Sequence, residues 1–145
     1  MADYLSQGMK RFNYLTSEID NTYHEISRKL NLSDSAVMIL YTICNFGDCC
    51  LLNDIPRLSG VSKQTINSGL RKLEREGVVF LETYQGKRKL VRLTEQGKRL
   101  VQNTVARLIE MENEAFAAWT EEEQKIYLEL TERFLLQMKE KAKEL

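Results

Sequence analysis

Residues 61–77 have the sequence VSKQTINSGLRKLEREG, and the fold depends on this stretch more than on any other. Ser62 is a helix N-cap residue type, because its hydroxyl can accept a hydrogen bond from a backbone N–H of the first turn. Gly77 suits the left-handed residue that follows a helix. The preceding segment, residues 53–60, has capping residues at its start, proline in its first turn and glycine at its end. Two helices joined by a tight turn are the plan of a helix-turn-helix.

The second of these helices has two chemically different faces. Three apolar residues recur at helical spacing and form one stripe: Ile66, Leu70 and Leu73. Polar residues fall on the opposite side: Gln64, Ser68, Arg71 and Arg75. Glutamine can pair with adenine and arginine with guanine, and a helix N-terminus favours phosphate. A solvated surface helix has the same pattern, so the neighbouring segments must decide between the two interpretations.

After Gly77 the apolar period changes from about 3.6 to 2, which is typical of β-strands. Residues 78–84 and 89–94 are the predicted strands, and QGKR at residues 85–88 is the turn between them. This hairpin is the wing of a winged helix. Its basic tip can protect an edge strand, or it can straddle a DNA backbone beside the recognition helix.

The charge is distributed unevenly along a chain whose net charge is zero. Residues 57–99 hold eleven of the 21 Lys and Arg but only four of the 21 Asp and Glu. The segment therefore carries +7, and it coincides with the helix-turn-helix and the wing. A local basic segment in a neutral chain indicates an anionic polymer as the partner, and together with the wing it favours DNA.

Four further helices are predicted around this region, over residues 9–30, 33–44, 94–118 and 120–145. Each has apolar residues at helical spacing, and the last three begin at capping residues. The first and the last two expose more apolar surface than one small head can cover. We therefore expect a mainly α protein with a small β-hairpin wing, in which a winged helix-turn-helix head is joined to a helical dimerisation arm.

The order of these elements, the stretch 62–77 and the wing-closing sequence VRLTEQG at residues 91–97 resemble the MarR family of transcription regulators over essentially the whole chain. The resemblance implies a single MarR-like domain over residues 1–145. Residues 33–99 would form the DNA-binding head, and residues 1–31 and 100–145 the dimerisation arm. It also implies a homodimer that binds a pseudo-palindromic operator with half-sites about one helical turn apart. In the wing, Gln85 stands where the family commonly has an aspartate that orients a wing arginine.

The DNA contacts expected from the pattern and the resemblance lie on the recognition helix and the wing. They are Ser62, Lys63, Gln64, Thr65, Asn67, Ser68, Arg71, Lys72, Arg75, Lys87, Arg88 and Lys89. Family members often bind a small aromatic or anionic effector between arm and head and then release DNA. The candidate effector residues are Tyr14, Tyr23, His24, Tyr41 and Trp119, although aromatic residues at helical spacing are more often core.

Three cysteines, Cys44, Cys49 and Cys50, offer an alternative thiol-based redox switch. We expect Cys44 to pack in the core, and Cys49 and Cys50 to lie in a loop as reduced thiols. With a single histidine, no metal site is expected, and no cofactor is implied.

The sequence thus predicts a double-stranded DNA-binding transcription regulator, most simply a repressor released by an effector. A winged-helix dimer used as a protein-interaction scaffold is the alternative. An enzyme finds no support, because neither a Gly-rich phosphate loop nor a nucleophile elbow occurs. The chain has no apolar run long enough for a membrane span, its first residues lack a secretion-signal core, and the cysteines form no secreted framework, so we expect a cytoplasmic protein.

Overall fold

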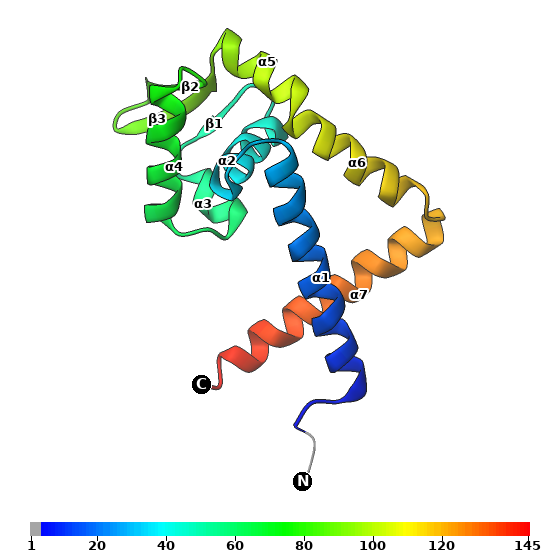
Figure 1. The fold of residues 1–145 in the computed structure, drawn as a ribbon. Helices are drawn as coiled ribbons and strands as arrows, with labels where there is room; N and C mark the ends of the chain where they lie inside the picture. The colour runs from blue at the N-terminus through cyan, green and yellow to red at the C-terminus, as the bar shows by residue number, and fades with distance from the viewer. Residues whose placement is uncertain (1–3) are drawn as a thin grey trace. The chain divides into compact units, whose positions relative to one another are not determined.

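The predicted helix-turn-helix is present in the computed structural model, which describes residues 4–145 (Figure 1). It consists of α3 (Asp54–Ser59) and α4 (Lys63–Arg75). Gly60 ends α3 with a φ of 72°, a left-handed conformation that favours glycine. The Ser62 hydroxyl accepts a 3.2 Å hydrogen bond from the Thr65 N–H and so caps α4 as predicted.

Two helices precede this motif, α1 (Gln7–Lys29) and α2 (Asp34–Asn45). Ser33 caps α2 by accepting a hydrogen bond from the Ala36 N–H at 3.1 Å. Helix α2 supplies much of the head's core, whose largest fully buried side chains are Ile39, Leu40, Ile43, Ile55, Ile66, Val91 and Val105. In contrast, α1 buries only Ser27 and extends away from the head (Figure 1).

The wing belongs to a three-stranded antiparallel sheet with the strand order β1-β3-β2. Strands β2 (Val79–Tyr84) and β3 (Arg88–Leu93) form the predicted hairpin, and β1 (Cys49–Leu51) pairs with the other edge of β3. The prediction that residues 49 and 50 lie in a loop was therefore wrong. A three-residue strand is too short to show alternation, and its partner lies some 40 residues further along the chain, so only the tertiary contact reveals it.

The prediction of a single helix over residues 94–118 was also wrong. Two helices occupy this stretch, α5 (Glu95–Asn103) and α6 (Val105–Ala117). Thr104 interrupts it with φ −131° and ψ −88°. The buried Thr104 hydroxyl donates to the Leu100 carbonyl oxygen at 2.7 Å, and such bonding to the preceding turn bends helices. The bend lies within the head's core, where Val101 and Val105 are also buried.

The chain divides into two units at Leu108. The second unit contains the rest of α6 and the whole of α7 (Glu121–Ala142), joined at a sharp corner around residues 118–120 (Figure 1). Helix α7 begins with the predicted capping box, in which Thr120 and Glu123 bond each other's backbone N–H groups. None of the residues of α7 is buried. The division into head and arm remains a prediction, and residues 1–3 of the expected arm lie outside the described residues.

Candidate nucleic-acid interface

Helix α4 presents one face to the core and the other to solvent, as the sequence predicted. Ile66, Leu70 and Leu73 are between 1% and 4% exposed. The polar residues of the opposite face are all exposed: Gln64, Asn67, Ser68, Arg71, Lys72 and Arg75. A helix with this division can enter a major groove without disturbing the core that holds it.

Gly69 lets α4 approach α2 closely. A Cβ atom at this position would lie 2.9 Å from the Ser35 Oγ and 3.1 Å from the Ile39 Cδ1, both on α2. These separations are shorter than ordinary van der Waals contacts, so a larger residue would push the two helices apart. The glycine therefore sets the distance between α4 and α2, and with it how far the exposed face of α4 projects from the head.

Residues 94–97, which follow the last strand of the wing, hold the C-terminal end of α4 against the base of the wing. The Thr94 hydroxyl donates to the Gly77 carbonyl oxygen at 2.6 Å and accepts from the Gly97 N–H at 2.9 Å. The Gln96 amide donates to the Glu76 carbonyl oxygen at 3.3 Å. Recognition helix, wing and α5 are thus joined by a few residues, which fixes the angle between the two candidate DNA-binding elements.

The wing carries its positive charge at an exposed tip formed by Lys87, Arg88 and Lys89. An ion pair braces the hairpin closer to its base, where the Arg92 Nε lies 2.8 Å from the Glu82 Oε2. Both side chains are about 40% exposed, so the pair contributes roughly 0–1 kcal/mol. The sequence did not reveal this pair, because Glu82 lies opposite Leu90 and Arg92 opposite Phe80, so the two side chains meet diagonally across the hairpin.

A polar groove of about 490 Å³ runs between the N-terminus of α2 and α4. Its lining combines two elements: Ser33, Ser35, Gln64, Thr65, Ser68, Gly69 and Lys72. A second hollow of about 260 Å³ lies between the β1–α3 connection and the wing tip, lined by residues 51–54 and 87–89. Predicted contact residues therefore line both hollows. The groove between α2 and α4 also includes Ser33 and Ser35, which the sequence did not predict as contact residues.

The cations of this surface have no acidic partners within residues 4–145. None of the predicted contact residues Lys63, Arg71, Lys72, Arg75, Lys87, Arg88 and Lys89 takes part in a salt bridge there. By contrast, Arg57, Arg92 and Lys98 of the same basic segment pair with carboxylates. All the unpaired positive charges of this segment except Arg99 on α5 lie on α4 and the wing tip, where phosphates would supply counter-charges.

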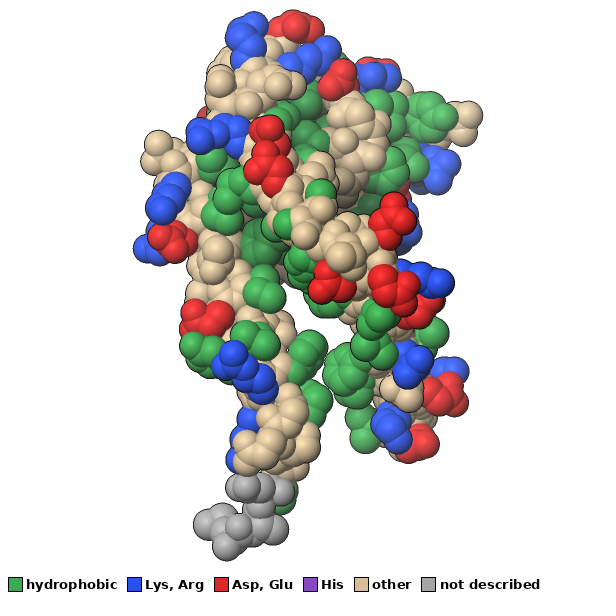
Figure 2. All heavy atoms as spheres, turned by 90° about the vertical axis from the view of Figure 1, so that its right-hand side faces the viewer, with side chains coloured by type: hydrophobic (Ala, Val, Ile, Leu, Met, Phe, Trp, Pro, Cys, Tyr) green, Lys and Arg blue, Asp and Glu red, His purple; other side chains and the backbone are tan. Residues whose placement is uncertain are grey.

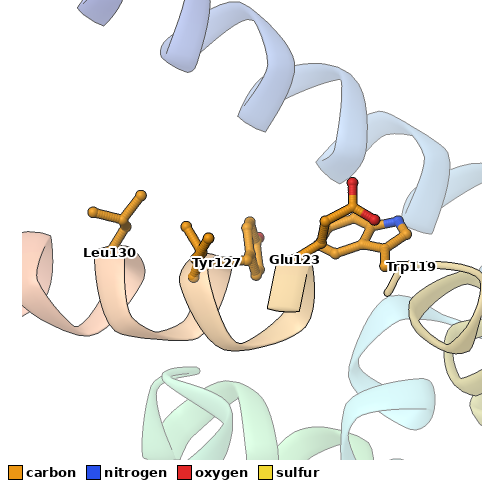
Figure 3. Close-up of a pocket in the computed structure, with 5 residues that line it drawn as sticks. Trp119, Glu123, Tyr127 and Leu130 are labelled. Carbon is orange, nitrogen blue, oxygen red and sulfur yellow. The ribbon is translucent and has the colours of Figure 1, made fainter. Parts of the chain in front are cut away.

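The five residues predicted for an effector pocket are distributed over both units. Tyr14 and Tyr23 are exposed on α1, and Tyr41 is half-buried on α2. His24 is also exposed, and its Nδ1 lies 2.6 Å from the Asp34 Oδ2, a hydrogen bond between α1 and α2 that the sequence did not reveal. Trp119 lies in the second unit beside Tyr127 and Glu123, at a groove of about 370 Å³ (Figure 3).

The cysteines lie at the edge of the sheet and at the end of α2, and two of them are poor candidates for reactive thiolates. Burial raises the pKa of the Cys50 thiol to about 12, with Asp54 adding to the shift. Burial, followed by the charge of Asp48, also raises the pKa of the Cys44 thiol. Redox-sensing thiols need the opposite shift, because the thiolate is the reacting form. Cys44 is half-buried rather than fully packed.

Residues 4–145 offer neither a metal site nor a membrane-spanning helix. No group of three or more His, Cys, Asp or Glu side chains suited to a metal ion occurs there. Among the helices of this described part, none is both long enough and apolar enough to cross a membrane.

Comparisons with known proteins agree with this geometry. The MarR family model matches residues 30–89, which contain α2, α3, α4 and most of the wing. A MarR-family regulator from Neisseria meningitidis has a similar structure, with a TM-score of 0.77 and 19% sequence identity over 94% of this chain and 96% of that one. No curated protein sequence matches.

Two other solved structures share the fold. Staphylococcus aureus MepR in its DNA-binding conformation gives a TM-score of 0.75 with 20% identity, covering 92% of this chain and 99% of that one. NadR in complex with 4-hydroxyphenylacetate gives 0.70 with 14% identity, covering 92% and 96%. The MarR family model thus matches the winged helix-turn-helix head, and the solved structures share the fold of nearly the whole chain.

Proposed function

We propose that this protein is a transcription regulator that binds a specific double-stranded DNA sequence in the cytoplasm, most simply as a repressor. The observation that carries the proposal is the set of unpaired cations on the exposed face of α4 and on the wing tip. Helix α4 is held rigidly against α2 and the wing, so its base-facing side chains are preorganised. Arg71 would contact bases, while Lys72, Arg75 and the wing tip would contact phosphates.

The regulator would act as a homodimer. Leu15 and Ile19 of α1 are 44% and 53% exposed, and Ile126 and Leu130 of α7 are 44% and 51% exposed. Figure 2 shows hydrophobic side chains on the surface of α1, the helix that leads to the grey N-terminal residues. Apolar stripes of this length on amphipathic helices need a partner surface, and a second copy of the chain supplies one. A symmetric dimer would present two α4 helices to a pseudo-palindrome.

Release of DNA would be controlled by a small aromatic or anionic effector. The support is indirect: NadR, whose fold this chain shares, has been solved in complex with 4-hydroxyphenylacetate. The residues proposed to contact such an effector are Tyr14, Tyr23, His24 and Tyr41, which all belong to the first unit. A thiol switch is the weaker proposal, because burial of Cys44 and Cys50 opposes thiolate formation.

The test begins with selection from a randomised double-stranded DNA pool, followed by titrations of the enriched site at several salt concentrations. Contacts to about six phosphates predict a log–log salt slope near −5. Arg71→Ala should lower affinity for the selected site by about 1–3 kcal/mol and affect random DNA much less. Lys87→Ala should weaken both DNAs alike and make the salt slope shallower by about 1 per subunit.

The matched control is Lys125→Ala, which removes an exposed lysine from α7 in the other unit and should leave both affinities unchanged. Equal losses on selected and random DNA for Arg71→Ala would contradict the assignment of this residue to base contacts. Absence of any enriched sequence would favour the protein-interaction scaffold over the regulator.

A further inference from the structure

Three polar side chains on the outer face of α4 have no partner within residues 4–145. Gln64, Ser68 and Arg71 are exposed. Their side chains form no hydrogen bond and no salt bridge with other described residues. The amide, the hydroxyl and the guanidinium are therefore all available to a ligand that approaches this face of the helix.

These three side chains form one row along α4. At about 100° per residue, Gln64 and Arg71 differ by only about 20° around the helix axis, and Ser68 lies within about 60° of both. A rise of about 1.5 Å per residue places Gln64 and Arg71 about 10.5 Å apart along the axis. The row therefore has a long polar side chain at each end and a short one between them.

Other polar residues of the helix are placed for different tasks. The Ser62 hydroxyl donates to the Thr65 Oγ1 at 3.0 Å and accepts from the Thr65 N–H at 3.2 Å, so both residues are used in the cap. Lys72 lies about 100° from Arg71 around the helix axis, to one side of the row. In a major groove the sides of a helix face the sugar-phosphate backbone, so this lysine is placed for phosphate. The row itself faces the bases.

The two ends of the row recognise different bases. The Gln64 amide both donates and accepts, which matches the N6 donor and N7 acceptor of adenine. The Arg71 guanidinium only donates, which matches the O6 and N7 acceptors of guanine. Each pairing forms two hydrogen bonds, so a wrong base leaves at least one polar group without a partner.

We propose that each half-site of the operator presents an adenine to Gln64 and a guanine to Arg71, about two or three base pairs apart. The spacing follows from the separation along the helix, because helix residues spaced over two turns read bases within about three successive pairs in zinc fingers. Ser68 would face the intervening position and select weakly, since a hydroxyl accepts several base edges. This assignment rests on the proposed function and adds the base content of the half-site.

The test repeats the DNA selection with variants of the intact protein and compares the preferred base at each position. Arg71→Ala should remove the preference for guanine at one position of each half-site, and Gln64→Ala the preference for adenine at another. In titrations of single-base variants of the site, the wild type should prefer each correct base by about 5- to 150-fold. The corresponding alanine variant should prefer it by less than about twofold.

Arg71→Gln separates base reading from a merely structural role. An amide in place of the guanidinium should change the preferred base from guanine to adenine at the same position, which a loss of stability would not do. Glu74→Gln is the matched control, because Glu74 is exposed on the same helix but lies outside the row. It should select the same bases as the wild type. Circular dichroism checks that each variant folds.

Three outcomes would overturn the assignment: unchanged base preferences in both alanine variants, continued selection of guanine by Arg71→Gln, or affected positions that are not two or three base pairs apart. An enriched inverted repeat with any of these outcomes would leave the proposed regulator standing. Absence of any enriched sequence with the wild type would instead contradict the proposed function, and with it this half-site.

Discussion

Among the glycines of the chain, Gly97 has the least room for a side chain. A Cβ atom here would overlap the carbonyl oxygen of Val78, which belongs to the chain entering β2. Backbone cannot rotate away as a side-chain end can, so either α5 or the strand must move. We expect Gly97→Ala to lower the free energy of unfolding by about 1–3 kcal/mol or more, measured by urea denaturation.

Gly8→Ala is the matched control for this substitution. Gly8 lies in the first turn of α1, and the nearest atom to a new Cβ would be 4.0 Å away. Alanine there should cost nothing and can raise stability by up to about 1 kcal/mol. Equal stability of the two variants would show that α5 does not pack on the chain entering β2 as described.

At the scale of helices and strands, the sequence best predicted the features that depend on residues close together in the chain. The caps at Ser33, Ser62 and Thr120 depend on residues within one turn, and the structure confirms all three. The stripe of α4 was equally predictable, since helical period alone separates its faces. For the candidate DNA-binding surface, the exposure of every predicted contact residue is confirmed, although DNA contact itself remains a prediction.

What the sequence did not predict depends on contacts between distant segments. Strand β1 exists because Cys49 pairs opposite Arg92, and the bend at Thr104 lies where that residue is buried in the core. Ser35 joins the groove beside α4 because Gly69 allows close packing of α2. The ring contacts of Trp119 with Phe116 and Tyr127 form because α6 ends near Trp119 and α7 turns back toward it.

The N-terminus of α7 should respond to acid through Glu123. Hydrogen bonding to Thr120 lowers the pKa of this carboxyl in the folded protein from its ordinary value of 4.5. A group whose folded pKa is depressed contributes stability above its unfolded pKa, and this contribution is lost as pH falls through the folded pKa. We expect the fluorescence of Trp119 to report local loosening of this corner below about pH 4.5.

Glu123→Gln should lack this acid-dependent component, because glutamine keeps the hydrogen bond at every pH. Glu122→Gln removes a carboxylate from the same turn without touching the capping box, and its acid transition should match that of the wild type. An identical acid profile for Glu123→Gln and the wild type would contradict the assigned role of this hydrogen bond.

At the scale of the whole molecule, the dimer is the assembly on which the proposed function depends. Ile19 is 53% exposed in the middle of the apolar stripe of α1, and Asn21 is exposed on the opposite side of the same helix. Ile19→Glu should therefore shift the protein from dimer to monomer in sedimentation velocity. Asn21→Glu adds the same charge and should leave the dimer intact. A monomeric wild type, or equal effects of the two variants, would contradict the proposed interface.

A rigid dimer should bind tightly only to operators whose two half-sites have the correct spacing. If two α4 helices enter successive major grooves on one face of the duplex, half-site centres lie about 34–36 Å apart. Inserting about five base pairs rotates one half-site by roughly half a turn, so only one head can bind and the affinity falls to that of a single head. Fluorescence anisotropy with selected and spaced sites measures this loss. The Ile19→Glu monomer should bind both sites equally weakly, and a wild type indifferent to spacing would show that the two heads bind independently.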